Sequence, residues 1–254
     1  MERRNLKPGT LHAPLPAVMV TVGDMEESNI ITVAWTGILS SEPPRAYISV
    51  RPSRHSHKML LERGEFVINL TTEKLAYATD YSGIYTGAKV DKFEKLSLTK
   101  AKSLEVSAPT IAESPLALEC RVFERLSFGT HDVFMADIVN VSADETLLDD
   151  KGRICLERAG LMAYAHGEYY ALGERLGKFG FSASKETKAQ MNRANTKSEK
   201  SSTKKASAKN VAEKPTSATE GKTKASDGEK KPYYAKFVNK KGGKNSKAKG
   251  KKSK

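Results

Sequence analysis

The segment "ISVRPSRHSHKM" (residues 48–59) gathers side chains that are suited to holding an anion. Arg51 and Arg54 carry planar guanidinium groups, which donate paired hydrogen bonds to a phosphate. Ser53 and Ser56 can cap a helix or bond a phosphate oxygen. The segment passes from a strand-like run to a helical one, and a helix N-terminus offers free N–H groups and a favourable dipole. A solvated, well-capped strand-to-helix turn explains the same residues equally well.

The histidines and cysteines form no recognisable metal or nucleophile motif. His55 and His57 share a face only on a strand and lack a third ligand, so we expect hydrogen-bond donors or surface residues. Cys120 and Cys155 have no C-x-x-C partner, and we expect both to be buried as small apolar side chains. P-loop, dinucleotide-binding, zinc-protease and hydrolase signatures do not occur in the sequence. We therefore predict no metal ligand and no catalytic side chain.

Short strands are the elements that must position the anion-binding segment. Apolar and β-branched residues alternate through most of the runs, and few long helical patterns separate them. This order favours an antiparallel barrel or sandwich over a doubly wound sheet. "GAKVDKFEKLSLT" (87–99) is expected to be a loop with an isolated Phe93. A hairpin of two strands is expected over 15–23 and 29–39, single strands over 46–50 and 65–70, and two long strands on either side of "SFGTHD". Helices are expected over 56–63, ending at Gly64, and over 72–83.

Charge divides the chain of 254 residues into two parts. Residues 182–254 hold 21 Lys and one Arg against six acidic residues, a net charge of +16, whereas residues 1–181 carry −3. The basic part has almost no apolar residues to bury, so we expect a disordered tail. No run approaches the roughly 20 apolar residues of a membrane span, and two cysteines favour a reducing cytoplasm over a secreted fold.

A succession of motifs carries a family resemblance over residues 16–94. "PAVMVTVG", "NIITVAWTG", "PPRAYISVRPSRHSHKML", "GEFVINL" and "VDKFE" follow one another in that order. The sequence thereby resembles the flavin reductase-like family of FMN-binding split barrels, and within it the flavoredoxin-like branch. "APTIAESPLALECRV" and "HGEYYALGERLG" resemble the second half of the family. The resemblance covers about residues 8–181 and leaves the tail outside.

The resemblance implies a mainly β domain over residues 1–181, a six-stranded antiparallel split β-barrel with a few short helices. Such proteins are usually homodimers with FMN near the subunit interface. By position in the family's motifs, one group of residues would contact the isoalloxazine ring and another the phosphate and ribityl chain. Without the resemblance, Trp35 would be assigned to the barrel core and Lys92 to the surface. The implied cofactor-binding residues are Thr32, Trp35 and Thr36 for the ring, Arg51, Ser53, Arg54, His55 and Ser56 for the phosphate side, and Asn69, Lys92 and Phe93 as further members.

Two classes of function are open at this stage. The first is an FMN flavoprotein: an NAD(P)H-dependent flavin reductase, or a flavoredoxin-type electron carrier, acting through flavin N5 and passing electrons to a redox partner protein or free flavin. Thr36 or backbone N–H groups would stabilise the reduced ring. The second is a barrel scaffold whose Lys-rich tail binds nucleic acid or another acidic surface. Residues 230–254 hold 11 Lys and no acidic residue, with three aromatic residues between them.

Overall fold

The computed structural model describes residues 2–184. Contacts divide the chain into Met1–Phe179 and Gly180–Lys254, and the described part of the second unit holds a single 3₁₀ turn, Phe181–Ala183. The predicted disordered tail lies outside the described residues, apart from its first three. Within residues 2–184, no helix is both long enough and apolar enough to cross a membrane.

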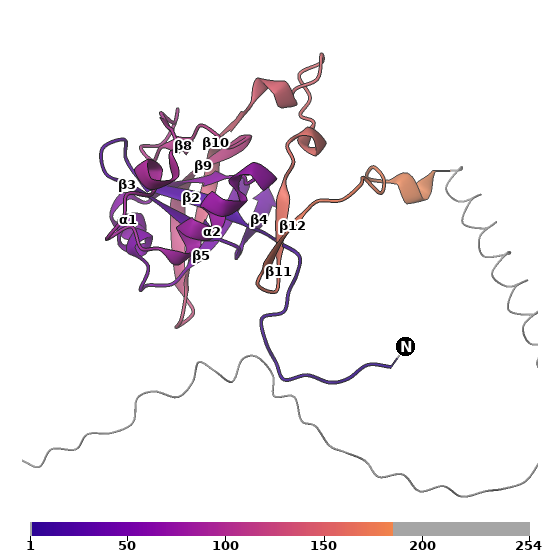
Figure 1. Cartoon of the computed structure of the whole chain (residues 1–254), viewed down its shortest axis with the longest axis horizontal. Coiled ribbons are helices and arrows are strands. Elements are labelled where there is room, and N and C mark those ends of the chain that lie inside the picture. The colour runs from indigo at the N-terminus through magenta and orange to yellow at the C-terminus, as the bar shows by residue number, and fades with distance from the viewer. Residues whose placement is uncertain (1, 185–254) are drawn as a thin grey trace, which may run out of the picture. The chain divides into compact units, whose positions relative to one another are not determined.

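One antiparallel sheet of seven strands forms the body of the first unit (Figure 1). Its order is β3-β2-β6-β9-β10-β5-β4, and the two long strands β9 and β10 form a hairpin, as predicted. The resemblance implied six strands, and the sheet has seven. The strands are β2 (Val18–Gly23), β3 (Ser28–Val33), β4 (Thr36–Ser41), β5 (Pro44–Val50), β6 (Glu65–Asn69), β9 (Leu116–Ser127) and β10 (Asp132–Ala143).

The two edge strands of this sheet are consecutive in the chain. Only Ala34 and Trp35 separate β3 from β4, although these strands stand at opposite ends of the order. Since two residues span only a few ångströms, the sheet must curl until its edges meet there. The Ser49 N–H donates to the Trp35 carbonyl at 2.9 Å and ties the link to β5. The expected continuous strand over 29–39 is therefore wrong, because the chain crosses between edges at this point.

Both faces of the sheet are covered, as β2 illustrates. Val18, Val20 and Val22 pack in the main core with Phe66 and Phe134. Met19, on the other face, packs in a second cluster with Ile30, Leu75 and Phe93. Alternate side chains of a strand point to opposite faces, so a strand that is buried along its whole length needs a layer on each side.

Short helices cover the sheet (Figure 1). Helix α1 (His55–Arg63) ends at Gly64, whose φ of 64° is the left-handed value that favours glycine, as predicted. Helix α2 (Ala76–Ile84) follows a 3₁₀ turn at Glu73–Leu75, where one helix over 72–83 was expected. Helix α3 (Lys92–Leu96) replaces the expected loop, because the Asp91 carboxylate caps it by accepting from the Phe93 and Glu94 N–H groups.

Two smaller sheets complete the unit. β1 (Leu15–Pro16) pairs with β11 (Met162–Ala165), which forms a hairpin with β12 (Glu168–Ala171). The strands β7 (Lys100–Ala101) and β8 (Thr110–Ile111) form the other sheet. The β1–β11 pairing brings the end of the unit back to its beginning. The hairpin thereby reaches the region where β3 passes into β4.

Candidate functional site

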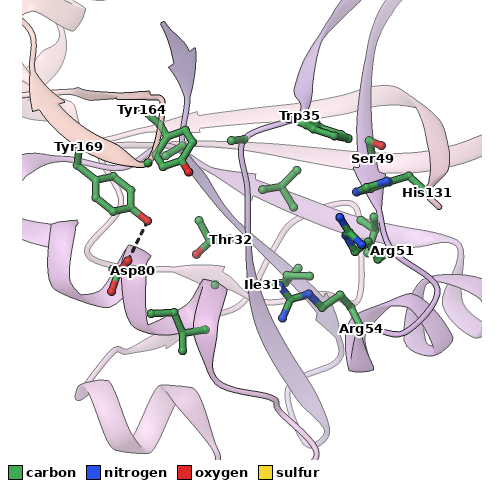
Figure 2. A pocket seen from close by; sticks show the side chains of 17 residues that line it. Ile31, Thr32, Trp35, Ser49, Arg51, Arg54, Asp80, His131, Tyr164 and Tyr169 are labelled. Carbon is green, nitrogen blue, oxygen red and sulfur yellow. Dashed lines mark hydrogen bonds between the residues drawn. The ribbon is translucent and has the colours of Figure 1, made fainter. Parts of the chain in front are cut away.

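Two adjoining cavities lie beside the link between β3 and β4. The larger, of about 460 Å³, is lined by β3, the link, the end of β5, helix α2 and the β11–β12 hairpin (Figure 2). The smaller, of about 60 Å³, lies at the N-terminus of α1 and is lined also by Lys92 and the residues after α2. Ile31 and Arg54 line both cavities. The larger cavity has the size of a small-molecule or cofactor site, and the smaller could hold a single compact group.

One wall of the larger cavity contains a pair of neighbouring aromatic rings. The Trp35 indole and the His131 imidazole have centroids 4.6 Å apart and planes tilted by 37°. Burial, and then the positive charge of Arg51, lowers the pKa of His131, so its ring is neutral at pH 7. Trp35 is 39% exposed, which shows that it is not a core residue of the barrel. The pair offers a flat surface for another planar ring.

A second aromatic pair faces this cavity from the β11–β12 hairpin. Tyr164 and Tyr169 have ring centroids 5.4 Å apart, and the Tyr169 hydroxyl donates to Asp80 Oδ1 of α2 at 3.3 Å (Figure 2). Burial, followed by the nearby Asp80 carboxylate, raises the pKa of Tyr169 to about 12. Tyr169 therefore remains a protonated donor, and its bond to Asp80 holds the hairpin to α2 across the cavity.

Thr32 connects β3 to α2 at the bottom of the larger cavity. Its hydroxyl donates to the Thr79 carbonyl, so its oxygen has only acceptor capacity left for a ligand. Helix α2 approaches closely because residue 83 is glycine: a Cβ there would lie 3.3 Å from the Thr32 Cβ. Arg51 and Arg54 lie at another side of the cavity, with their guanidinium groups near the cavity (Figure 2).

The smaller cavity contains a buried lysine that has no carboxylate partner there. Lys92 is 3% exposed, and its Nζ donates to the Ile30 carbonyl at 2.6 Å and the Ser82 carbonyl at 2.8 Å. Burial, and then the positive charge of Arg54, lowers the pKa of Lys92 to about 8. An ammonium group has three protons to donate, so one remains after these two bonds.

The other groups around the smaller cavity are also donors or hydroxyls. The Ser82 hydroxyl is buried and has no hydrogen-bond partner among the described residues. Asn29 Nδ2 donates to Ser56 Oγ at 2.7 Å, which leaves the Ser56 proton free to donate. The first turn of α1 leaves N–H groups without an intrahelical acceptor, and the Arg54 side chain does not cap them. None of the lining residues is acidic. The arrangement is complementary to an anion.

The structure brings most of the predicted residues together. Thr32, Trp35 and Arg51 line the larger cavity, and Arg54 lines both. Exposed Ser53, partly buried His55 and buried Ser56 line the smaller cavity, together with Lys92. Lys92 is therefore not the surface charge that its sequence context alone implies.

Three predicted residues have other surroundings. Thr36 Oγ1 donates to the Tyr47 carbonyl at 2.6 Å and lines neither cavity, so its proton is not available to a ring there. Buried Asn69 joins strands: Nδ2 donates to the Met19 carbonyl at 3.1 Å, and Oδ1 accepts from the Ile111 N–H. Phe93 packs in the second core cluster, because the turn of helix that points Lys92 to the cavity points Phe93 inward.

Several residues at the site were not predicted from the sequence. Neither His131 nor Asp80 was given a role. Tyr164 was not singled out, and Tyr169 appeared only in the "HGEYY" motif of the family's second half. That motif was the available signal, but the pairing of β1 with β11 is what carries it to the cavity.

His57, Cys120 and Cys155 lie outside the two cavities. His57 Nε2 lies 2.8 Å from Asp132 Oδ2 in a buried pair, which confirms a hydrogen-bonding role. Cys120 is buried, and burial raises the pKa of its thiol to about 12, so it is inert as expected. Cys155 is only half-buried, contrary to expectation, because it lies in the loops after β10.

Comparison with known proteins identifies the class of this fold and site. The family described as "Flavin reductase like domain" matches residues 11–173, and the chain belongs to this family. The structure of flavoredoxin from Desulfovibrio vulgaris (Miyazaki F) is 32% identical, with a TM-score of 0.67 over 72% of this chain and 100% of that one. A second flavoredoxin structure, from Methanosarcina acetivorans, is 25% identical with a TM-score of 0.65. The two flavoredoxin matches place the chain in the flavoredoxin branch.

A curated relative adds a reductase to this picture. The reductase component of an FADH(2)-dependent resorcinol hydroxylase from Rhizobium sp. is 27% identical over 56% of this chain and 78% of its own length. The family and these relatives support a flavin-binding protein of the flavin reductase type.

Proposed function

We propose that the protein binds FMN across the two cavities, with the ring system in the larger and the phosphate in the smaller. The adjoining arrangement carries this proposal: a flavin-sized cavity with aromatic walls opens, at Ile31 and Arg54, into a compact cavity lined by Lys92 and hydroxyl groups. A Thermus thermophilus structure that is 25% identical, with a TM-score of 0.58, is described as an FMN-binding protein, which supports this choice of flavin.

The buried ammonium group of Lys92 has no carboxylate partner in the smaller cavity. Taking an ammonium group out of water without a carboxylate is unfavourable, and the lowered pKa of Lys92 reflects that cost. A phosphate near Nζ would offset it and would accept from the Ser82 and Ser56 hydroxyls and the first N–H groups of α1. Arg54 would hold the phosphate at the mouth, since its side chain is exposed and lines both cavities.

The residues around the larger cavity would orient the ring system. FMN, when bound, supplies the hydride and electron-transfer chemistry. The Trp35–His131 pair provides an aromatic wall, and the Tyr169–Asp80 bond holds the hairpin against α2. Thr32 accepts but does not donate, so it suits an N–H of the ligand. The proposal assigns no side chain the role of catalytic acid or base.

We propose that the activity is NAD(P)H-dependent reduction of the flavin, with electrons passed on to a partner protein or to free flavin. The alternative within the same fold is a flavoredoxin-type carrier that holds FMN tightly and oxidises NAD(P)H slowly. The visible spectrum of the purified protein, and identification of the chromophore released by heat, test the flavin. Anaerobic bleaching by NADH or NADPH then separates reductase from carrier. A colourless protein that does not bind added FMN would contradict the proposal.

We also propose that the protein is a homodimer located in the cytoplasm. Apolar side chains are exposed on an edge strand and at a hairpin turn, with Ile38 of β4 65% exposed and Phe128 after β9 67% exposed. An unpaired strand edge that carries an exposed apolar side chain is a surface that a second copy of the chain can cover. Sedimentation equilibrium of the full chain would test this, and a monomer at micromolar concentration would contradict it.

A further inference from the structure

A third cavity, of about 430 Å³, lies between the N-terminal arm and the link from β3 to β4. The opposite side is formed by Trp35 and Tyr47, and the arm contributes Thr10, His12, Pro14, Leu15 and Pro16. Its volume lies within the range of small-molecule sites. The flavin proposal makes no use of this cavity.

The lining of this cavity differs in chemistry from that of the flavin cavities. Rings of Trp35, Tyr47 and His12 dominate it, with two prolines and Leu15, and it contains no Asp, Glu, Lys or Arg. The Thr36 hydroxyl has already donated to the Tyr47 carbonyl at 2.6 Å. A charged ligand would lose its hydration there without gaining a partner, whereas a flat apolar ring would find aromatic contacts. The lining therefore selects an uncharged aromatic molecule.

The position of the cavity connects it to the flavin site. Ala34 and Trp35 line both this cavity and the 460 Å³ cavity, so the two are neighbours across the strand link. Leu15 pairs with Tyr164, which lines the larger cavity, through the β1–β11 ladder. A molecule bound here would contact the same indole as the proposed flavin.

We propose that this third cavity is a binding site for an uncharged mono- or bicyclic aromatic molecule, occupied at the same time as the flavin site. The proposal concerns binding alone and assigns no reaction to the ligand. The flavin proposal and this one fail separately, because FMN is titrated alone first and naphthol is then titrated into the chain both with and without FMN.

Calorimetric titration of the FMN-saturated full chain with 2-naphthol, an uncharged bicyclic probe at pH 7, tests the proposal. We expect one site per chain. Leu15→Arg places a charge in the third cavity but not in the flavin cavities, and should weaken naphthol binding at least about tenfold while leaving FMN binding unchanged. Leu6→Arg is the matched control, since Leu6 is 73% exposed and lines none of the three cavities.

Three results would overturn the proposal. The first is the absence of naphthol binding, and the second is displacement of FMN by naphthol. The third is a change of oligomeric state in Leu15→Arg, which would show that the surface around the third cavity is an interface between two copies of the chain. If Leu15→Arg does not fold, Thr10→Glu introduces a charge from the exposed arm and must weaken naphthol binding in the same way.

Discussion

Lys92→Met removes the ammonium group from the small cavity and keeps a side chain of similar length. If Lys92 holds the phosphate, the substitution removes one charge-assisted hydrogen bond, which contributes about 1.5–3 kcal/mol. That loss corresponds to an increase of roughly 10- to 100-fold in the Kd of FMN. Riboflavin has no phosphate, so its Kd should be the same for Lys92→Met and the unaltered protein.

The dependence of binding on pH gives the same prediction an independent test. The pKa of Lys92 in the free protein is lowered from 10.5 to about 8, with burial as its first cause. A bound phosphate stabilises the charged form and raises this pKa, so FMN binding takes up a proton above pH 8. FMN affinity should therefore be constant from pH 7 to 8 and should fall as pH rises further, by up to about tenfold per pH unit. Lys92→Met should abolish this fall.

The stability of the flavin-free protein should change with pH in the opposite sense. Because the folded-state pKa of Lys92 lies below its unfolded value, the unfolded chain binds more protons between about pH 8 and 10.5. The contribution of Lys92 to the free energy of unfolding therefore rises across that window and is least favourable below pH 8. Thermal melts of both proteins from pH 7 to 10 measure it by difference.

The assay for binding is quenching of flavin fluorescence, with FMN and riboflavin titrated side by side from pH 7 to 9.5. Equal Kd values of FMN for Lys92→Met and the unaltered protein would refute the assignment of the phosphate to Lys92. A parallel weakening of riboflavin would show instead that the substitution disturbs the ring site through the lost bonds to Ile30 and Ser82.

Three further predictions test other parts of the site. Gly87→Ala should weaken FMN binding about tenfold or more, because a Cβ there would lie 2.2 Å from Asn29 Oδ1 and would break the Asn29–Ser56 hydrogen bond. Ala88→Gly is the control, and an unchanged Kd of FMN for Gly87→Ala would contradict the prediction. Tyr169→Phe removes the hydrogen bond to Asp80, so we expect little change in the Kd of FMN but a faster release of bound flavin, measured by stopped flow. An unchanged release rate would show that the hairpin does not hold the flavin. A chain ending at Ser184 should keep its flavin, since the residues that line the proposed flavin cavities lie between positions 17 and 169. It should also lose any salt-sensitive binding to RNA or DNA. A truncated chain without flavin would contradict the first expectation.

The sequence by itself determined the class of fold and pointed to the segment that lines the smaller cavity. Strand periodicity, which is local, predicted the antiparallel strands and the β9–β10 hairpin. The segment over residues 48–59 could be recognised because its hydrogen-bond donors lie within a few residues of one another at the start of α1. Helix termini and short-range donors are local features, so they can be recognised without knowledge of the rest of the chain.

Only the tertiary structure decided which residues meet at the larger cavity and which are buried. The curling of the sheet splits residues 29–39 into two edge strands, so Thr32 faces the flavin cavity while Thr36 is used to bond Tyr47. Tyr169 reaches Asp80 across 89 positions of sequence. One turn of helix after Asp91 directs Lys92 to the small cavity and Phe93 to the core. Such outcomes depend on long-range packing, and residue type and spacing along the chain do not encode that packing legibly.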